Sequence, residues 1–363
     1  MRERAAGTPA DTGTGTGTGS GTGIGMPDGA GAGVETVAGR VADPGATLMH
    51  EHVFGLSPEI LWNWPDIPEG WEQERRAREA AARLDDLKRH GIDTIVDLTV
   101  VGLGRHVPAV QRVAELTEVN IVAATGLYTY DALPPYFGNR GPGSLFGGPD
   151  RLAEFFVRDI AEGIGRTGVK AGVLKCASDH LGMTKGCERV FRAVAEAHLE
   201  TGVPISTHSH SASGGGLEQQ RLLAGLGVDL SRVVIGHAGD STDLAYLEEL
   251  IANGSYLGMD RFGIETISPF EDRVAVVAEL AARGHADRMV LSHDSYCFND
   301  RFDADVVRRR HPNYHLLHIS RDVLPELRRR GVTPEQIDRM LVANPRAILT
   351  RRETRGAVPG GTS

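Results

Sequence analysis

The stretch Thr47-Leu-Met-His-Glu-His52 places two histidines, His50 and His52, on a short run that has the composition of a β-strand. Side chains on a strand alternate between its two faces, so these two imidazoles point the same way and can reach one metal ion. A lone His-x-His pair is weak evidence, because histidines also occur in cores and on surfaces. A metal site is therefore indicated only if further ligand residues occur at matching positions along the chain.

Composition limits the class of protein. The chain has 363 residues, of which 40% are hydrophobic and 24% charged, as in an ordinary globular protein with a large core. The net charge is −9 and the basic residues are spread along the chain, which argues against nucleic acid and anionic membranes as partners. No apolar run approaches the ~20 residues that a bilayer span needs.

The three cysteines, Cys176, Cys187 and Cys297, form no Cys-x-x-Cys motif and cannot all pair. This usage fits a reducing compartment, so we expect a cytoplasmic protein. Residues 1–34 are dominated by Gly and Thr and are expected to form a disordered tail, and residues 351–363 a second flexible tail. Between them, residues 35–350 are predicted to form a single domain.

Within this domain, β-rich runs alternate with longer helical patterns. Strands are predicted over 47–50, 94–100, 121–126, 171–176, 204–208, 233–237, 256–260 and 289–294. Helical periodicity covers 72–90, 150–165, 188–201, 217–226, 243–253, 270–283 and 317–330. Such alternation implies a parallel sheet of the α/β class.

Two architectures fit this alternation. Eight rounds suggest closure into a (β/α)8 TIM barrel, whereas an open doubly wound sheet also alternates but need not stop at eight strands. The residues at the strand ends favour the barrel, because its chemistry lies at the carboxyl ends of the strands.

Four further strands end in a polar residue, namely Lys175, His208, His237 and Asp294. Each alone has a structural explanation: His237 could be a buried core histidine and Lys175 a salt-bridged lysine. Together with His50 and His52, however, six candidate ligands fall where barrel strands reach the mouth. This coincidence favours a metal site.

Imidazoles and carboxylates suit a borderline divalent ion such as zinc. Four histidines and one aspartate exceed the needs of one tetrahedral site, so two ions are expected. Lys175 needs a separate account, because an ammonium group has no lone pair. Carboxylation by carbon dioxide would convert it into an anionic carbamate that can bridge two metals.

The arrangement resembles the phosphotriesterase branch of the amidohydrolase superfamily over residues 39–349, and within it most closely the phosphotriesterase-like lactonases. The lactonase resemblance rests on five stretches: Val101-Gly-Leu-Gly-Arg105, Gly126-Leu-Tyr-Thr-Tyr130, Gly216-Leu-Glu-Gln-Gln220, Gly258-Met-Asp-Arg-Phe-Gly263 and Leu291-Ser-His-Asp294. It implies that His50, His52 and Asp294 hold a buried metal, that His208 and His237 hold a more exposed one, and that carboxylated Lys175 bridges them. Zinc is the expected metal, and cobalt, iron or manganese would also be compatible.

The same resemblance places Tyr128 over the exposed metal and Arg261 beside it. Tyr128 would hold the ester oxygen of a lactone or donate to the leaving alkoxide, with a packed aromatic as the alternative. Arg261 would orient Tyr128 or the substrate, with a structural ion pair as the alternative. Asp294 is expected to accept the proton released when a metal-bridging hydroxide attacks.

Other nearby residues are expected to have plainer roles. His293 and His210 are not ligands in the family pattern, whereas Asp97 and Asp260 are candidates to hold the metal-binding histidines from behind. The sequence departs from the subgroup after Lys175, where Cys-Ala-Ser-Asp-His-Leu-Gly182 replaces the usual acidic residue and proline. Residues 295–315 are expected to form a long lid without clear secondary structure.

The sequence thus predicts a metal-dependent hydrolase that opens acyl-homoserine or other aliphatic lactones and hydrolyses phosphotriesters weakly. One alternative is an organophosphate hydrolase that acts mainly on aryl phosphotriesters, and another is a non-catalytic metal-binding protein. The expected partner is a small lactone or ester, and relatives suggest a homodimer.

Overall fold

The computed structural model describes residues 33–67 and 70–351, all of which belong to one compact unit, Gly31–Ser363. The predicted tails at 1–34 and 351–363 lie outside the described residues except at positions 33, 34 and 351. Over the described ranges, no helix is both long and apolar enough to cross a membrane.

A sheet of parallel strands forms the centre of the unit, in the order β10-β9-β8-β7-β6-β5-β4-β3-β11. Eight of its strands coincide with those predicted from the sequence, and β11 is additional. The strands are β3 (Thr47–Gly55), β4 (Thr94–Asp97), β5 (Asn120–Gly126), β6 (Val173–Ala177), β7 (Ile205–His208), β8 (Val233–Ile235), β9 (Tyr256–Met259), β10 (Met289–Leu291) and β11 (Tyr296–Asn299).

The sheet closes because the residues after β10 run along β3. The backbone N–H of Asp294 donates to the carbonyl of His50 at 2.9 Å, and that of His52 donates to Ser295 at 2.9 Å. β11 then pairs with β3 in parallel, with Tyr296 opposite His52. The last strands therefore meet the first, and the fold is the predicted TIM barrel.

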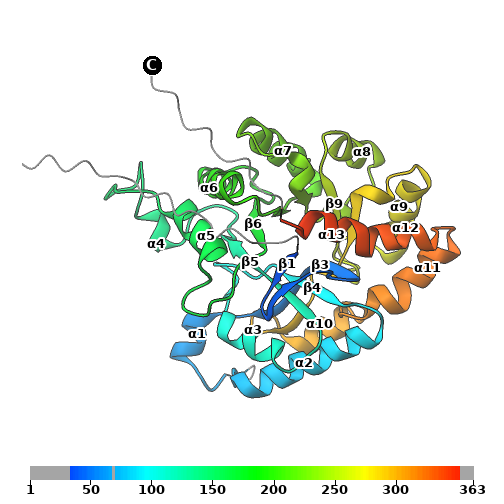
Figure 1. Ribbon diagram of the computed structural model, residues 1–363, viewed down its shortest axis with the longest axis horizontal. Coiled ribbons are helices and arrows are strands. Elements are labelled where there is room, and N and C mark those ends of the chain that lie inside the picture. Colours follow the sequence, from blue (N-terminus) through cyan, green and yellow to red (C-terminus); the bar gives the residue numbers. More distant parts are fainter. Residues whose placement is uncertain (1–32, 68–69, 352–363) are drawn as a thin grey trace, which may run out of the picture. The chain divides into compact units, whose positions relative to one another are not determined.

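Helices lie outside the strands (Figure 1). They are α1 (Pro58–Asn63), α2 (Gln73–Arg89), α3 (Val107–Ala114), α4 (Pro135–Gly138), α5 (Leu152–Ala161), α6 (Lys185–Thr201), α7 (Gly215–Gly225), α8 (Leu244–Ala252), α9 (Phe270–Ala282), α10 (Ala304–Arg310), α11 (Leu324–Arg329), α12 (Pro334–Asp338) and α13 (Asn344–Leu349). Each longer helix buries one face, as α2 does with Ala77, Leu84 and Leu87.

Two apolar layers flank the strands. Leu48, Leu174 and Ile235 belong to the large cluster that includes the buried faces of the helices. Residues of opposite parity, such as Val122, Val173, Val234 and Val290, form a second cluster with Met49 and with Ile348 and Leu349 of α13. This second cluster fills the barrel interior beneath the carboxyl ends of the strands. The polar residues at those ends therefore lie directly above a packed apolar layer.

Several local features differ from the sequence-based expectations, and the short helices α1, α4, α12 and α13 were also unpredicted. An antiparallel hairpin, β1 (Val34–Thr36) and β2 (Gly39–Val41), precedes the barrel. α3 went unpredicted, because Pro108 reads as a loop residue although it stands in the first turn, where proline is tolerated. The stretch 295–315 contains β11 and α10, so the expectation of a lid without secondary structure was wrong.

Glu51 ties the closing segment to β3 from the helix side of the sheet. Its completely buried carboxylate accepts hydrogen bonds from the backbone N–H of His293 at 2.8 Å and of Ser295 at 3.0 Å. It also contacts the His293 ring, with Nδ1 2.7 Å away. These contacts satisfy donors that water cannot reach.

We expect Glu51→Ala to lower the free energy of unfolding by about 3 kcal/mol or more, because it leaves buried polar partners unsatisfied. Urea unfolding followed by circular dichroism measures this change, with Glu59→Ala in exposed α1 as the control. A loss below about 1 kcal/mol would show that the barrel closes without this carboxylate.

Candidate metal centre

The structure brings the predicted ligand residues together at the carboxyl ends of the strands. His50 and His52 lie on β3, and Asp294 follows β10. Oδ1 of Asp294 lies 3.0 Å from Nε2 of His52 and 3.4 Å from Nε2 of His50. Ligand atoms of His50, His237 and Asp294 all lie within 4.8 Å of one another, as one ion requires.

His208 and His237 form a second pair of histidines beside Asp294, and His237 also belongs to the group just described. Nδ1 of His208 is 2.7 Å from Nε2 of His237, and Oδ2 of Asp294 is 4.0 Å from the same Nε2. Asp294 therefore faces both pairs of histidines. All four histidines are buried.

Lys175 lies on β6 and is completely buried. Its Nζ donates to the carbonyl oxygen of Thr207 at 3.1 Å. Burial lowers the pKa of Lys175 to about 8, against the attraction of Asp294 and Asp260. A fraction of the amine is therefore neutral near physiological pH, and the neutral amine is the form that carbon dioxide can carboxylate.

The approach of β5 to Lys175 requires a glycine. Gly126 has a φ of +138°, and a Cβ atom there would lie 1.9 Å from the carbonyl oxygen of Lys175. Any side chain would push the two strands apart and displace the lysine.

A set of acceptors lies behind the histidines. The Asp260 carboxylate, which follows β9, contacts Nδ1 of His50 at 2.9 Å and Nδ1 of His237 at 2.8 Å. The Thr99 hydroxyl lies 2.8 Å from Nδ1 of His52. Asp97, the other predicted supporter, is 4.0 Å from that nitrogen and accepts instead from the Thr99 backbone N–H.

These acceptors orient the rings for metal binding. Although burial opposes it, contacts with His237 and His50 hold the pKa of Asp260 well below its usual range, so it is a carboxylate and must accept. Burial lowers the pKa values of His50, His208 and His237, the second of them to about 4. A neutral imidazole that donates its N–H to an acceptor behind it keeps a lone pair on the other nitrogen, which faces the centre.

Such an arrangement needs a cation. Nδ1 of His208 and Nε2 of His237 face one another across 2.7 Å, with the Asp294 carboxylate beside them. Divalent metal ions neutralise this kind of donor set, and nitrogen with carboxylate oxygen is the preference of zinc. The residues present therefore fit a metal centre.

Backbone strain is concentrated in the same place. Across the described ranges, the non-glycine residues with positive φ are His237 (62°), Arg261 (61°) and Asp294 (57°). Left-handed backbone is costly for such residues and is retained where the surroundings fix it, often at functional sites.

Tyr128 and Arg261 border the centre. The Tyr128 hydroxyl contacts Tyr130 and lies 3.3 Å from Nδ1 of His208. Arg261 donates to Asp294 at 3.2 Å and to Asp240 at 2.9 Å. The ion pair considered as the alternative for Arg261 is thus present, and one of its two carboxylates is the candidate ligand Asp294.

Two histidines lie outside the centre, as expected. His293 contacts Glu51 with Nδ1, accepts from the Ile319 backbone with Nε2, and so faces away from Asp294. His210 contacts Ser213. Cys176 is buried in the outer apolar cluster.

The sequence analysis missed several residues near the centre: Thr99, Tyr130, Asp179, Asp240, Tyr296 and Tyr314. Asp179 contacts Nε2 of His208 at 2.5 Å, and the Tyr296 ring stacks on His52 at 4.4 Å. The Tyr314 hydroxyl donates to the backbone carbonyl of Asp294. Of these, Asp179 and Asp240 could have been found from the sequence, because both are acidic residues within four positions of a predicted ligand.

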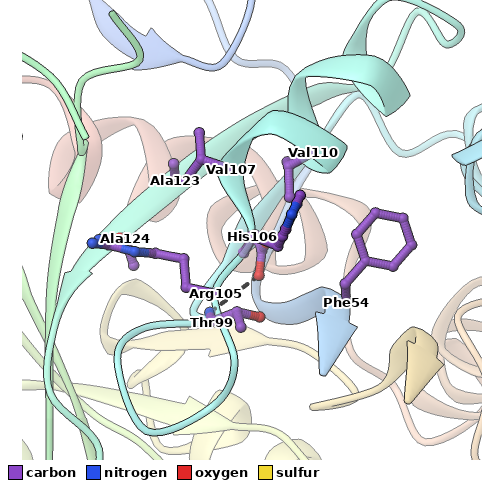
Figure 2. A pocket seen from close by; sticks show the side chains of 9 residues that line it. Phe54, Thr99, Arg105, His106, Val107, Val110, Ala123 and Ala124 are labelled. Atoms are coloured by element: carbon purple, nitrogen blue, oxygen red, sulfur yellow. Dashed lines mark hydrogen bonds between the residues drawn. The ribbon is translucent and has the colours of Figure 1, made fainter. Parts of the chain in front are cut away.

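A small enclosed cavity of about 10 Å³ lies behind Thr99, with room for about one water molecule. Figure 2 shows side chains from β3, β5, α3 and the connection after β4 around it, including Phe54, Thr99 and His106. It is too small to admit a substrate and lies on the outer side of the ligands.

The mouth of the barrel has an apolar rim. All strongly exposed large hydrophobic side chains of the described residues except Leu199 lie on the connections, short helices included, that come after the strands, with Trp62, Trp64, Leu145 and Phe146 the most exposed. Trp71, by contrast, packs edge-on against Phe54.

A closed parallel barrel with histidines and carboxylates gathered at its strand ends is the architecture of a barrel hydrolase. The chain belongs to the phosphotriesterase family, whose model matches residues 32–349, which confirms the resemblance to this family noted from the sequence. This is a family of binuclear metal enzymes.

Two relatives and one solved structure support this assignment. A phosphotriesterase homology protein of Mycobacterium tuberculosis is 59% identical over 312 residues, covering 86% of this chain and 95% of its own. An aryldialkylphosphatase of Saccharolobus solfataricus is 38% identical over 310 residues, covering 85% and 96%. The structure of the phosphotriesterase from Mycobacterium tuberculosis matches with a TM-score of 0.85 and 57% identity over 88% of this chain and 98% of that one.

Because its histidines are buried, we expect the metal-free protein to lose stability at acidic pH. Between pH 6.5 and 4 the unfolded chain takes up a proton on His208 that the folded protein does not, so the contribution of His208 to stability is lost as pH falls through this window. The lowering of the His208 pKa to about 4 corresponds to about 3 kcal/mol.

Urea unfolding of the chelator-treated protein at about pH 7, 5.5 and 4 measures this effect. We expect His208→Gln to reduce the loss by about 3 kcal/mol, and the control His90→Gln, at the outer end of α2, to leave it unchanged. Equal losses in wild type and His208→Gln would contradict the assignment.

Proposed function

We propose that this protein is a binuclear-metal lactonase that opens aliphatic lactones, acyl-homoserine lactones among them, with weak activity toward phosphotriesters. The observation that carries the proposal is the Tyr128 hydroxyl, placed 3.3 Å from Nδ1 of the candidate ligand His208. Membership of the phosphotriesterase family supports the hydrolytic chemistry.

The ligands follow from the donor set. His50, His52 and Asp294 would hold one ion and His208 and His237 the other, with carboxylated Lys175 between them. Zinc is the proposed metal. Two bound divalent ions lower the pKa of water and polarise the substrate oxygen.

Asp294 is the proposed proton acceptor. Burial tends to raise the pKa of Asp294. The electrostatic interaction with His50 and the hydrogen bond with His52 outweigh burial and hold this pKa well below the usual range, so the carboxylate is ionised. Arg261, which stays protonated, donates to Oδ2 and holds that oxygen in place. Asp294 can therefore take the proton of the attacking water as it adds to the carbonyl carbon.

Tyr128 is the proposed donor to the leaving group. Burial and its contact with Tyr130 raise its pKa well above the usual value, so the phenol keeps its proton at neutral pH. A protonated phenol can hold the ring oxygen of a lactone and protonate the alkoxide when the ring opens.

A second candidate is hydrolysis of aryl phosphotriesters as the main activity. The relative named aryldialkylphosphatase, 38% identical, favours it. The metal ligands cannot separate the two, because a phosphorus centre and the tetrahedral intermediate of a lactone need similar geometry. A non-catalytic metal-binding role is disfavoured by the combination of Asp294, Arg261 and Tyr128.

The decisive comparison is the turnover of a long-chain acyl-homoserine lactone and of an aryl dialkyl phosphate by the zinc-loaded protein. We expect kcat/KM to be higher for the lactone. Tyr128→Phe should lower kcat for the lactone about 100-fold, since one positioned acid contributes about this much. Tyr136→Phe, on the exposed α4 of the same loop, is the matched control. A preference for the phosphotriester would establish the second candidate, and negligible rates on both would favour the metal-binding protein.

Lys175→Ala should lose metal and activity together, because it removes the side chain proposed to bridge the two ions. Short carboxylic acids should restore part of both by replacing the carbamate. Metal content by mass spectrometry and lactone turnover measure the outcome, with Lys185→Ala on the surface of α6 as the control. Full activity of Lys175→Ala without added acid would remove the carbamate from the proposal.

A further inference from the structure

Arg273 is a buried arginine in the first turns of α9, and only 1% of its side chain is exposed. We propose that Arg273 is a positioning residue that holds Asp240 in the place from which Asp240 orients Arg261. The inference rests on the proposed hydrolase function, in which Arg261 keeps the Asp294 carboxylate in place.

The contacts of Arg273 use most of its hydrogen-bonding capacity. Nε donates to the carbonyl oxygen of Ser268 at 3.1 Å, and Nη1 donates to those of Gly239 at 2.8 Å and Asp260 at 2.9 Å. Nη2 donates to Oδ1 of Asp240 at 2.7 Å. Four of the five N–H groups of the guanidinium are therefore occupied. A charge at this depth is tolerated when it is paired and hydrogen-bonded in this way.

These acceptors come from two different connections at the mouth of the barrel. Gly239 and Asp240 follow β8, whereas Asp260 and Ser268 follow β9. The guanidinium of Arg273 lies between the two connections and contacts both. It therefore fixes the position of one connection relative to the other.

A chain of ion pairs leads from Arg273 to the candidate metal centre. The two oxygens of Asp240 are divided between two arginines, with Oδ1 2.7 Å from Nη2 of Arg273 and Oδ2 2.9 Å from Nη1 of Arg261. Nε of Arg261 in turn donates to Oδ2 of Asp294 at 3.2 Å. A shift of Arg273 would therefore turn the Asp240 carboxylate and move Arg261.

Arg261 needs this support because its backbone is strained. Its φ is +61°, a left-handed conformation that is costly for an arginine and persists where the surroundings fix it. Its guanidinium is held from the side of the candidate ligands by Asp294 and from the opposite side by Asp240. Arg273 fixes the second of these two carboxylates and does not contact the first.

A lysine cannot reproduce the contacts of Arg273. It carries the same charge on one nitrogen, whereas the planar fork of arginine reaches acceptors in several directions at once. Arg273→Lys therefore keeps the charge but cannot bind both connections and Asp240 together. Arg232→Lys is the matched control, because Arg232 is likewise buried and donates to backbone carbonyl groups, that of Ala347 at 2.8 Å among them. It directly precedes β8 and so lies at the opposite end of the strands from the ligands.

Kinetics of the zinc-loaded protein test the coupling, with the lactone or the phosphotriester, whichever is turned over. We expect Arg273→Lys to lower kcat about 10- to 100-fold and to leave KM nearly unchanged, because small misplacements of orienting groups have effects of about this size. Arg261→Met should give a similar loss. Because Arg273 acts through Arg261, the double variant should lose no more than Arg261→Met alone. Arg232→Lys should keep the wild-type constants.

Arginine NMR of the zinc-loaded full-length protein supplies a measurement without substrate. Arginine-selective ¹⁵N labelling shows the Nε–H signal of Arg261, which its loss in Arg261→Met assigns. We expect this signal to move toward the position of a freely exposed arginine in Arg273→Lys and to stay unchanged in Arg232→Lys. Thermal unfolding checks that the variants fold. If Arg273→Lys does not fold, Asp240→Asn, which keeps the size of the side chain, should give the same kinetic and spectral changes.

The proposal is overturned if folded Arg273→Lys keeps the wild-type kcat or the wild-type Arg261 signal, or if Arg261→Met keeps the wild-type kcat. A loss that adds to that of Arg261→Met, or a lower zinc content of Arg273→Lys, would also overturn it, because Arg273 would then act by another route. The same signal change in Arg232→Lys would show a general loosening and count against it equally.

The proposed function can fail without the positioning role. If the protein turns over neither substrate, the proposed function is refuted and the NMR measurement alone decides on Arg273. An Arg261 signal displaced only in Arg273→Lys would then support the positioning role, and an unchanged signal would overturn it.

Discussion

The hydrogen bonds between β3 and the residues after β10 connect the fold to its chemistry. The bond from the Asp294 N–H to the His50 carbonyl, 2.9 Å long, closes the barrel and at the same time fixes where the Asp294 side chain can go. With its left-handed backbone, Asp294 turns its carboxylate onto His50 and His52. A barrel that failed to close here would displace a carboxylate whose two oxygens face both pairs of histidines.

Burial explains the rest of the centre. Imidazoles at this depth lose their protons, as the lowered pKa values of His208 and His237 indicate, and so become good metal donors. Their orientation then depends on acceptors behind them, chiefly Asp260, which serves two rings with its two oxygens. Apolar layers beneath the strand ends exclude water from this network and strengthen it.

The sequence predicted the barrel and the convergence of six strand-end residues because both follow from periodicity. Period-two side chains put His50 and His52 on one face, and parallel strands bring all carboxyl ends to one mouth. It did not predict α3, which has a proline in its first turn, or β11, which pairs only because the chain folds back on β3. Tyr314 was missed because its contact with the Asp294 carbonyl depends on a loop conformation that no pattern encodes.

The two halves of the candidate centre are held by different parts of the molecule. His50, His52 and Asp294 are fixed by hydrogen bonds between strands, whereas His208 and its surroundings depend on loops, through Asp179 after β6 and Tyr128 after β5. Loops change more readily than strands without loss of the fold. Differences in substrate among relatives should therefore concentrate on the His208 side, and there they should alter metal affinity as well, because the same loops orient the ligand and border the pocket.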